Sequence, residues 1–245
     1  MGSRFISAVA LYGPKAGPVR DLLAGVQAMI AEHVGRDFRP YSLEQIHATL
    51  IALDAARDPR TGTIVNDYFL RHTGTAVEMD LPQVMSILAE RFADPLAMRI
   101  GGCRRDQPTP YLSRGVHPSE RAFCVQANAF VLIGWPVAAL SGDGRPLDRL
   151  RRDMNAAGVL HKYHRRESDV DDDFYLVVGH HSGAPASAVQ RAVAAVRDKL
   201  AAEPLDLAIG LGEVTIVAAD SHTLAPPLFT GAIPVDEATL LALMS

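Results

Sequence analysis

The apolar positions at the beginning of the chain predict a strand, a helix and a second strand. Residues 5–12 are apolar or small over the length of a strand, and the run ends at a Gly-Pro turn signal. Between Pro18 and Gly35 the apolar side chains recur at intervals of three and four, which predicts an amphipathic helix. Residues 45–53 are rich in β-branched and apolar types, so they predict a strand.

The same order of elements returns in the second half of the chain. Residues 122–135 predict a strand, a helix begins at Pro146, and residues 174–179 predict another strand. Because the two strand–helix–strand units have similar length, we infer an internal repeat. The pattern adds elements over 81–92 and 96–103, a helix over 185–200, a strand over 213–218 and a short helix over 235–244.

Two segments interrupt this regularity. Residues 54–79 and 104–121 show no sustained period, and we interpret them as insertions or long loops. No Gly/Ser-rich or Pro-rich linker divides the chain. We therefore expect one domain over 1–245, with a first lobe of roughly 1–121, a second lobe of roughly 122–245, and an exchange of chain between the lobes left open.

Composition limits the class of protein. Of 245 residues, 48% are apolar and 21% are charged, as in globular proteins. The net charge of −4 argues against a protein that coats nucleic acid or binds double-stranded DNA. Cys103 and Cys124 are too few for a disulfide framework, so we expect a reducing, cytoplasmic location. The longest apolar stretch, 130–140, is shorter than the ~20 residues of a membrane helix, so we expect no membrane partner.

The most informative motif is His47-Ala48-Thr49-Leu50, in the second predicted strand. Side chains alternate along a strand, so His47, Thr49 and Ile51 are expected on one face. A neutral imidazole transfers protons near neutral pH, and a threonine hydroxyl donates hydrogen bonds to phosphoryl oxygens. His47 and Thr49 are therefore the candidate catalytic residues for phosphodiester chemistry, with a packed structural histidine as the alternative.

With this motif and its repeated strand–helix–strand order, the chain resembles the 2H phosphoesterase superfamily, the RNA ligase-like and 2′,3′-cyclic phosphodiesterase-like proteins. The resemblance covers most of the chain. It implies an α+β fold of two lobes related by a pseudo-twofold axis, with antiparallel sheets and outer helices around a central cleft. It also implies that His47 is a general acid or base, that Thr49 binds phosphate, and that neither a metal nor another cofactor is needed.

The second motif of that family differs here. The corresponding segment is Tyr175-Leu176-Val177-Val178-Gly179, which places Tyr175 at the histidine position and Val177 at the threonine position. Tyrosine can donate a hydrogen bond but has a usual pKa of about 10, and valine cannot bind phosphate. We therefore predict Tyr175 as a substrate-binding residue and expect the two-histidine mechanism to be altered.

Four more residues are candidates for substrate contact. His164 and Arg165 belong to the basic segment 161–166, which either covers a phosphate or is a solvated loop neutralised by the aspartates that follow it. Tyr12 and Trp135 follow the first strand of each half and are candidates for stacking nucleobases, with packing of strand ends as the alternative.

Histidines and aspartates in the second half of the chain are weak candidates for a metal site. The histidines concerned are His161, His164, His180 and His181. Their spacing matches no established ligand pattern, and no cysteine set accompanies them. We therefore predict no metal site.

These observations leave two functions open. The first is a metal-independent phosphoesterase or phosphotransferase that acts on a nucleotide cyclic phosphate or an RNA-terminal phosphodiester. The second is a non-catalytic member of the family that binds a nucleotide or phosphorylated metabolite after losing one histidine motif. The expected partner is in both cases a small phosphate-containing ligand, and the sequence leaves the oligomeric state open.

Overall fold

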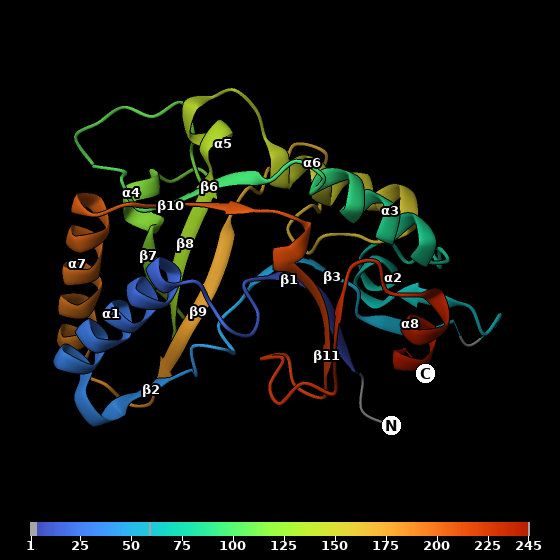
Figure 1. The fold of residues 1–245 in the computed structure, drawn as a ribbon, viewed down its shortest axis with the longest axis horizontal. Helices are drawn as coiled ribbons and strands as arrows, with labels where there is room; N and C mark the ends of the chain where they lie inside the picture. The colour runs from blue at the N-terminus through green and yellow to red at the C-terminus, as the bar shows by residue number, and fades with distance from the viewer. Residues whose placement is uncertain (1–3, 59, 245) are drawn as a thin grey trace.

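The structure, a computed structural model, describes residues 4–58 and 60–244 and is built on an antiparallel sheet with helices packed around it (Figure 1). This confirms the predicted α+β class. The main path of the sheet runs through β10 (Leu205–Ile209), β6 (Leu96–Ile100), β8 (Ala129–Pro136), β9 (Phe174–His181), β3 (Ala48–Ala52), β1 (Phe5–Ala10), β11 (Val214–Ala219) and β12 (Phe229–Ala232). Beside this path, β2 (Phe38–Pro40) pairs with β9 and β7 (Phe123–Gln126) pairs with β8.

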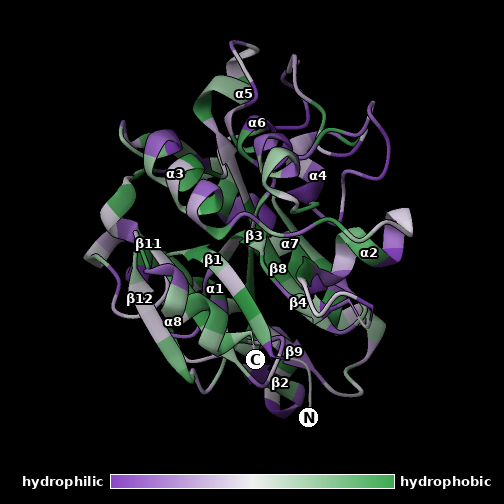
Figure 2. Ribbon diagram, turned by 90° about the vertical axis from the view of Figure 1, so that its right-hand side faces the viewer, coloured by the Kyte–Doolittle hydropathy of each residue, from purple (hydrophilic) through white to green (hydrophobic). Residues whose placement is uncertain are grey.

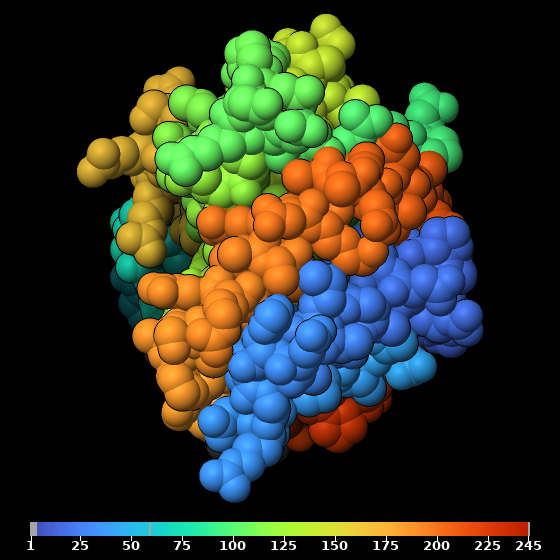
Figure 3. Space-filling view, turned by 90° about the vertical axis from the view of Figure 1, so that its left-hand side faces the viewer, coloured from blue at the N-terminus to red at the C-terminus, as the bar shows by residue number. Residues whose placement is uncertain are grey.

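Two long helices cover one side of the molecule. They are α1 (Gly17–Val34) and α7 (Ala186–Ala202), which contact each other and lie on the face seen in Figure 3, below green segments from the middle of the chain. The buried residues of α1 are Val19, Leu23, Val26, Ile30 and Val34. Their spacing of three and four residues is the pattern that predicted this helix, and it turns one stripe toward the core.

The remaining helices are shorter. They are α2 (Asp67–Thr73), α3 (Leu81–Arg91), α4 (Pro118–Arg121), α5 (Val137–Ser141), α6 (Pro146–Asp153) and α8 (Glu237–Leu243). Figure 2 shows hydrophobic residues concentrated on the central strands and hydrophilic residues on the outer loops and outer helix faces. Within the described part of the chain, no helix is long and apolar enough to cross a membrane.

Two details of the sequence-based elements differ in the structure. Of the two interpretations of 54–79, an insertion or a long loop, the long loop is wrong, because the segment contains a hairpin of β4 (Ala55–Arg57) and β5 (Ile64–Asn66) followed by α2. The predicted strand 122–135 is instead the hairpin of β7 and β8. Its turn contains Ala127 with a φ of 54°, a left-handed conformation that alanine seldom adopts, so composition did not signal the turn.

Strand β3 contains a bulge just after the candidate catalytic residues. Val9 of β1 pairs with Thr49, but the preceding residue Ala8 pairs with Ile51, so Leu50 is an extra residue in the ladder. The bulge reverses the alternation of side chains beyond it. The prediction that Ile51 shares the face of Thr49 is therefore wrong, and Ile51 is fully buried.

Strand β9 contains a matching bulge. Phe130 pairs with Gly179 and Val131 pairs with Val177, so Val178 is the extra residue. Gly179 is required there, because a Cβ atom on it would lie 2.6 Å from the carbonyl oxygen of Arg39 in β2. Strands β3 and β9 are antiparallel neighbours, and the two bulges lie on either side of the one pair of residues that is in register between them.

Candidate functional site

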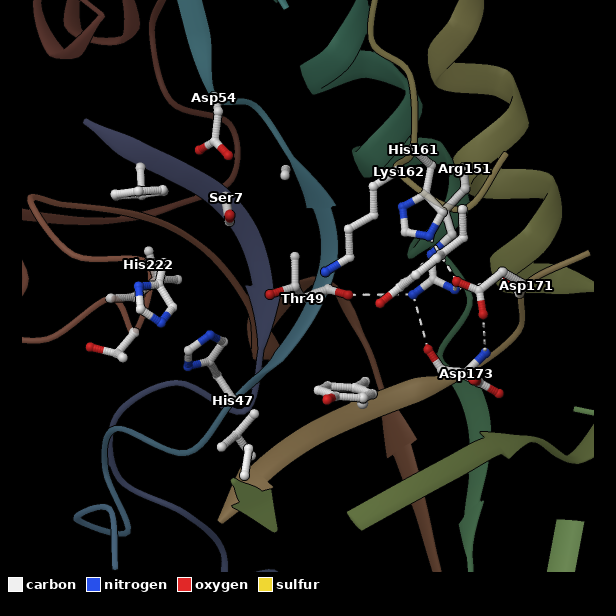
Figure 4. Close-up of a pocket in the computed structure, with 18 of the residues that line it drawn as sticks. Ser7, His47, Thr49, Asp54, Arg151, His161, Lys162, Asp171, Asp173 and His222 are labelled. Atoms are coloured by element: carbon white, nitrogen blue, oxygen red, sulfur yellow. Dashed lines mark hydrogen bonds and ion pairs between the residues drawn. The ribbon is translucent and has the colours of Figure 1, made fainter. Parts of the chain in front are cut away.

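A pocket of about 400 Å³ lies over β3, β9 and β1 (Figure 4). Both candidate motifs open into it, His47 and Thr49 from the first, Tyr175 and Val177 from the second. The sequence predicted that these two segments would share one site, and the structure brings them together. Because of the bulge in β9, His180 enters the same pocket, five residues after Tyr175.

The imidazole of His47 is held in one orientation by its own backbone. Its Nδ1 lies 2.7 Å from the carbonyl oxygen of Gln45, an acceptor, so Nδ1 carries the proton and Nε2 has a free lone pair. Burial lowers the pKa of His47, and the nearby charge of Lys15 lowers it further, while the Gln45 hydrogen bond opposes them. His47 is therefore a neutral imidazole at neutral pH, suited to accept a proton.

Thr49 is fixed through its backbone and leaves its hydroxyl available. Arg151 is almost fully buried, and its Nη2 donates to the carbonyl oxygens of Thr49 at 3.3 Å and of Asp173 at 3.0 Å. Its Nε donates to the carbonyl of Leu50 at the bulge. Within the described chain the Thr49 hydroxyl has no hydrogen-bond partner, so it can donate to a ligand in the pocket.

The second motif supplies no comparable pair of groups. The hydroxyl of Tyr175 donates to Oε1 of Gln126 at 3.1 Å, and burial raises the pKa of Tyr175. Val177 adds only an apolar surface. Tyr175 thus lines the pocket as predicted, but its phenol is an unfavourable proton donor or acceptor near neutral pH.

The segment between α6 and β9 brings positive charge to the pocket. Lys162 extends into it and points toward Thr49 in Figure 4. Among the described residues no carboxylate forms an ion pair with Lys162. Arg114, from the segment between β6 and α4, also lines the pocket, but Asp171 and Asp173 partly neutralise it at 3.5 and 3.2 Å. Lys162 is therefore the cation best placed to bind an anionic ligand.

His161 lies beside Lys162 and forms a buried pair with Asp171. Its Nε2 is 2.7 Å from Oδ2 of Asp171. Burial and the charge of Arg151 lower the pKa of His161 to about 3. Burial opposes ionisation of Asp171, but the His161 hydrogen bond and Arg151 outweigh it and lower the pKa of that carboxyl. The pair is a neutral imidazole against a carboxylate.

Trp135 does not reach the pocket, and its predicted role in stacking a base is wrong. The side chain is fully buried, and its Nε1 donates to Oδ1 of Asp173 at 2.8 Å. Ser113 donates to the same oxygen and Arg121 to the other one. Trp135 thus helps to hold a buried carboxylate at the start of β9.

Tyr12 and His164 are also absent from the pocket lining. The Tyr12 hydroxyl donates to the carbonyl of Leu224 at 2.6 Å, and its ring packs against the His47 ring with centroids 5.7 Å apart. His164 is buried, with Nε2 2.8 Å from Oδ1 of Asp148. Tyr12 supports His47 and His164 stabilises the loop, so neither lines the pocket in which both were predicted to contact substrate.

Arg165 lies next to the pocket but outside it. It lines a neighbouring hollow together with Lys162 and Tyr163, and its Nε lies 3.0 Å from the hydroxyl oxygen of Tyr68. Of the two basic-segment residues predicted to bind substrate, neither enters the pocket, while their neighbours Lys162 and Tyr163 do.

Several residues that line the pocket were not predicted as ligand contacts, among them Lys162, Tyr163, His180 and His222. Lys162 and Tyr163 lie in the segment that the sequence singled out, but a loop carries no period that tells which side chains turn inward. His180 was considered only as a metal ligand, and its entry depends on the β9 bulge. His222 lies in the loop after β11, and no local pattern marks it. Within residues 4–58 and 60–244, no group of three or more His, Cys, Asp or Glu residues could hold a metal ion.

No protein-family model and no curated protein matches the chain. Solved structures that are similar to this chain include TT0787 and ATU0111. TT0787 of Thermus thermophilus aligns with 95% of this chain and 100% of its own, at a TM-score of 0.44 and 14% identity. ATU0111, a conserved protein of unknown function from Agrobacterium tumefaciens str. C58, aligns with 95% of this chain and 86% of its own, at a TM-score of 0.50 and 10% identity. The likeness to ATU0111 concerns the fold alone.

Proposed function

We propose that the pocket binds the phosphodiester of a nucleotide cyclic phosphate or an RNA terminus, and that His47 transfers a proton during its hydrolysis. One observation supports this most strongly. The Nδ1 of His47 is tied to the Gln45 carbonyl, so its Nε2 lone pair is free in the cavity that also holds the Thr49 hydroxyl and the ammonium group of Lys162.

The strand order also supports the proposal. Outward from the β3–β9 pair, the sheet continues through β1, β11 and β12 on one side and through β8, β6 and β10 on the other. Both central strands bulge at the third position after His47 and Tyr175 respectively. Such correspondence is what a two-lobed, pseudo-twofold molecule of the 2H phosphoesterase type would have around its cleft.

The proposed chemistry needs a base and a means to neutralise phosphate. Nε2 of His47 takes a proton from water, whose oxygen then forms a bond to phosphorus as the bond to a ribose oxygen breaks. Thr49 donates a hydrogen bond to a non-bridging oxygen, and Lys162 compensates the charge that grows there. None of these steps calls for a metal ion.

Calorimetric titration with a nucleoside monophosphate tests the binding part of the proposal. A hydrogen bond to a charged group contributes about 1.5–3 kcal/mol, so Thr49→Val and Lys162→Met should each weaken binding by roughly 10- to 100-fold. Lys199→Met is the matched control, because Lys199 pairs with Glu203 on α7, away from the pocket. Equal affinities for all four proteins would contradict the proposal.

A second function, binding without catalysis, is favoured by the second motif. Val177 offers no hydrogen bond, and the Tyr175 hydroxyl is already engaged by Gln126. A protein of this kind would give the calorimetric result described above and show no turnover of any phosphodiester.

A further inference from the structure

Hydrolysis of a phosphodiester with an alkoxide leaving group needs a proton donor besides the base. Neither member of the second motif fills this role, since the Tyr175 phenol is bonded to Gln126 and has a raised pKa. Other titratable groups also line the pocket, and His161, Tyr163 and His180 are three of them.

Two of the other histidines that line the pocket, His180 and His161, are poor donors. The Nε2 of His180 lies 2.6 Å from the hydroxyl of Tyr41, and its Nδ1 lies 3.3 Å from Oδ1 of Asn128, so both nitrogens are engaged. Burial lowers the pKa of His180 and of His161. Both rings are therefore neutral and weakly acidic near neutral pH.

Tyr163 has the opposite surroundings. It lines the pocket, and the guanidinium carbon of Arg114 lies 3.5 Å from the centre of its ring. The ammonium of Lys162 lies 4.9 Å from the same point. Burial by itself would raise the pKa of Tyr163, but the charges of Lys162 and Arg114 outweigh burial and lower it. Two cations stabilise the phenolate, so the phenol gives up its proton more readily.

We propose that Tyr163, between Arg114 and Lys162, is the general acid that protonates the leaving ribose oxygen. The inference rests on the proposed function, because it assumes the same ligand and the same base. It assigns to a loop residue the task that the second motif does not perform.

The protons balance over one turnover. His47 takes one proton from the attacking water, and the P–O bond to that water forms. The bond between phosphorus and the ribose oxygen breaks, and this oxygen receives the phenolic proton of Tyr163. Transfer of the proton from His47 through solvent to the phenolate restores both groups, so the net reaction consumes one water molecule.

The groups that face Tyr163 come from three segments. Lys162, His161 and Arg165 belong to its own loop, where the His161 ring lies 5.5 Å away. Arg114 comes from the segment between β6 and α4, and Tyr175 from β9. Of these the two cations Lys162 and Arg114 have the largest effect on the phenol apart from burial.

Leaving-group dependence tests the assignment. Two esters of one nucleotide are compared, an alkyl phosphodiester and its p-nitrophenyl analogue, which leaves without protonation. Tyr163→Phe should lower kcat for the alkyl ester by ~10²-fold or more and affect the aryl ester far less. Tyr175→Phe is the matched comparison and should change both rates by the same factor.

Each result has a distinct meaning. If Tyr163→Phe changes both rates equally, or neither, Tyr163 is not the acid, while loss of aryl ester turnover in His47→Ala would still support the proposed site. Absence of turnover of both esters by the wild type would overturn the proposed activity and the assignment together.

Titration followed by tyrosinate absorbance gives an independent readout. One tyrosine of the wild type should ionise below the usual tyrosine pKa of 10.0, and this transition should be lost in Tyr163→Phe. A missing early transition in the wild type would overturn the assignment.

Discussion

Arg151 donates a hydrogen bond from Nη2 to the carbonyl oxygen of Thr49, 3.3 Å away. The same guanidinium holds the carbonyls of Leu50, Asp171 and Asp173 and forms an ion pair with the Asp171 carboxylate at 3.2 Å. One buried cation on α6 thus ties the bulge of β3, which carries the candidate site, to the segment that enters β9.

Replacement of this cation should destabilise the protein. Arg151→Met takes from Asp171 its fully buried cation, so that the partly exposed Arg114 and the neutral His161 are left beside it, and it leaves several carbonyls without this donor. Removal of one partner of a buried pair costs about 3–5 kcal/mol, so we expect the free energy of unfolding in urea to fall by that amount. Arg152→Met is the control, because Arg152 pairs with Asp148 from a more exposed position and its loss should cost about 1 kcal/mol or less. Equal effects of the two substitutions would contradict this account of Arg151.

The charge of Lys15 should tune the proton affinity of His47. Lys15 is one of the groups that lower the pKa of His47, so Lys15→Gln should raise it. NMR titration of the imidazole follows the pKa directly, and the acidic limb of a profile of kcat/KM against pH should shift to higher pH as the pKa rises. A pKa that stays unchanged or falls would show that the Lys15 charge does not act on His47.

Restoration of the second motif should increase activity. Tyr175→His together with Val177→Thr adds a second proton-transfer group and a second hydroxyl in the pocket that already contains His47 and Thr49. A gain in kcat of about tenfold or more would agree with the size of an acid–base contribution. Val177→Thr alone supplies only the hydroxyl, so it separates binding from proton transfer. No gain in the double variant, with affinity preserved, would mean that β9 does not position these side chains for the reaction.

Asp172 should make stability depend on pH. Burial raises its pKa from 3.8 to about 6, and Oδ2 has no hydrogen-bond partner in the described structure. Between these values the native state binds more protons than the unfolded state, so the free energy of unfolding falls as pH rises through this window. Asp172→Asn keeps an acceptor for the amide of Leu147 at the start of α6 and removes the charge.

Above pH 6 this variant should therefore be more stable than the wild type, by on the order of 2 to 3 kcal/mol, and the gain should shrink toward pH 3.8. Urea unfolding at several pH values measures it. A variant whose stability runs parallel to that of the wild type would show that Asp172 does not titrate in this range.

The parts of the fold that follow from sequence are those with a clear period. The spacing of apolar residues predicted α1 and the stripe that it buries, and the apolar run at the beginning of the chain predicted β1. The bulges in β3 and β9 were not predictable, because an extra residue leaves no mark on composition while it reverses the face of every residue beyond it. This is why Ile51 was placed on the wrong face and His180 was not expected in the pocket.

In the site as well, the residues on regular elements could be predicted and those on loops could not. Thr49 lies on β3 and His47 directly precedes that strand, and both line one pocket, as alternation along the predicted strand implied. The burial of Trp135 was not predicted, because burial at the end of a strand depends on packing from distant segments, here the Asp173 carboxylate and its donors. Lys162 and Tyr163 lie on a loop whose path is set by buried pairs such as His161 with Asp171, and these contacts are visible only in three dimensions.

The most direct test is hydrolysis of a panel of nucleoside 2′,3′-cyclic phosphates by the wild type and by His47→Ala, with a metal chelator present and ligand affinity measured in parallel. We predict weak turnover by the wild type that falls by ~10²-fold or more in His47→Ala while the affinity for product is largely kept. Strong turnover that survives His47→Ala would contradict the proposed role of His47, and turnover that requires a divalent metal would contradict the proposed chemistry.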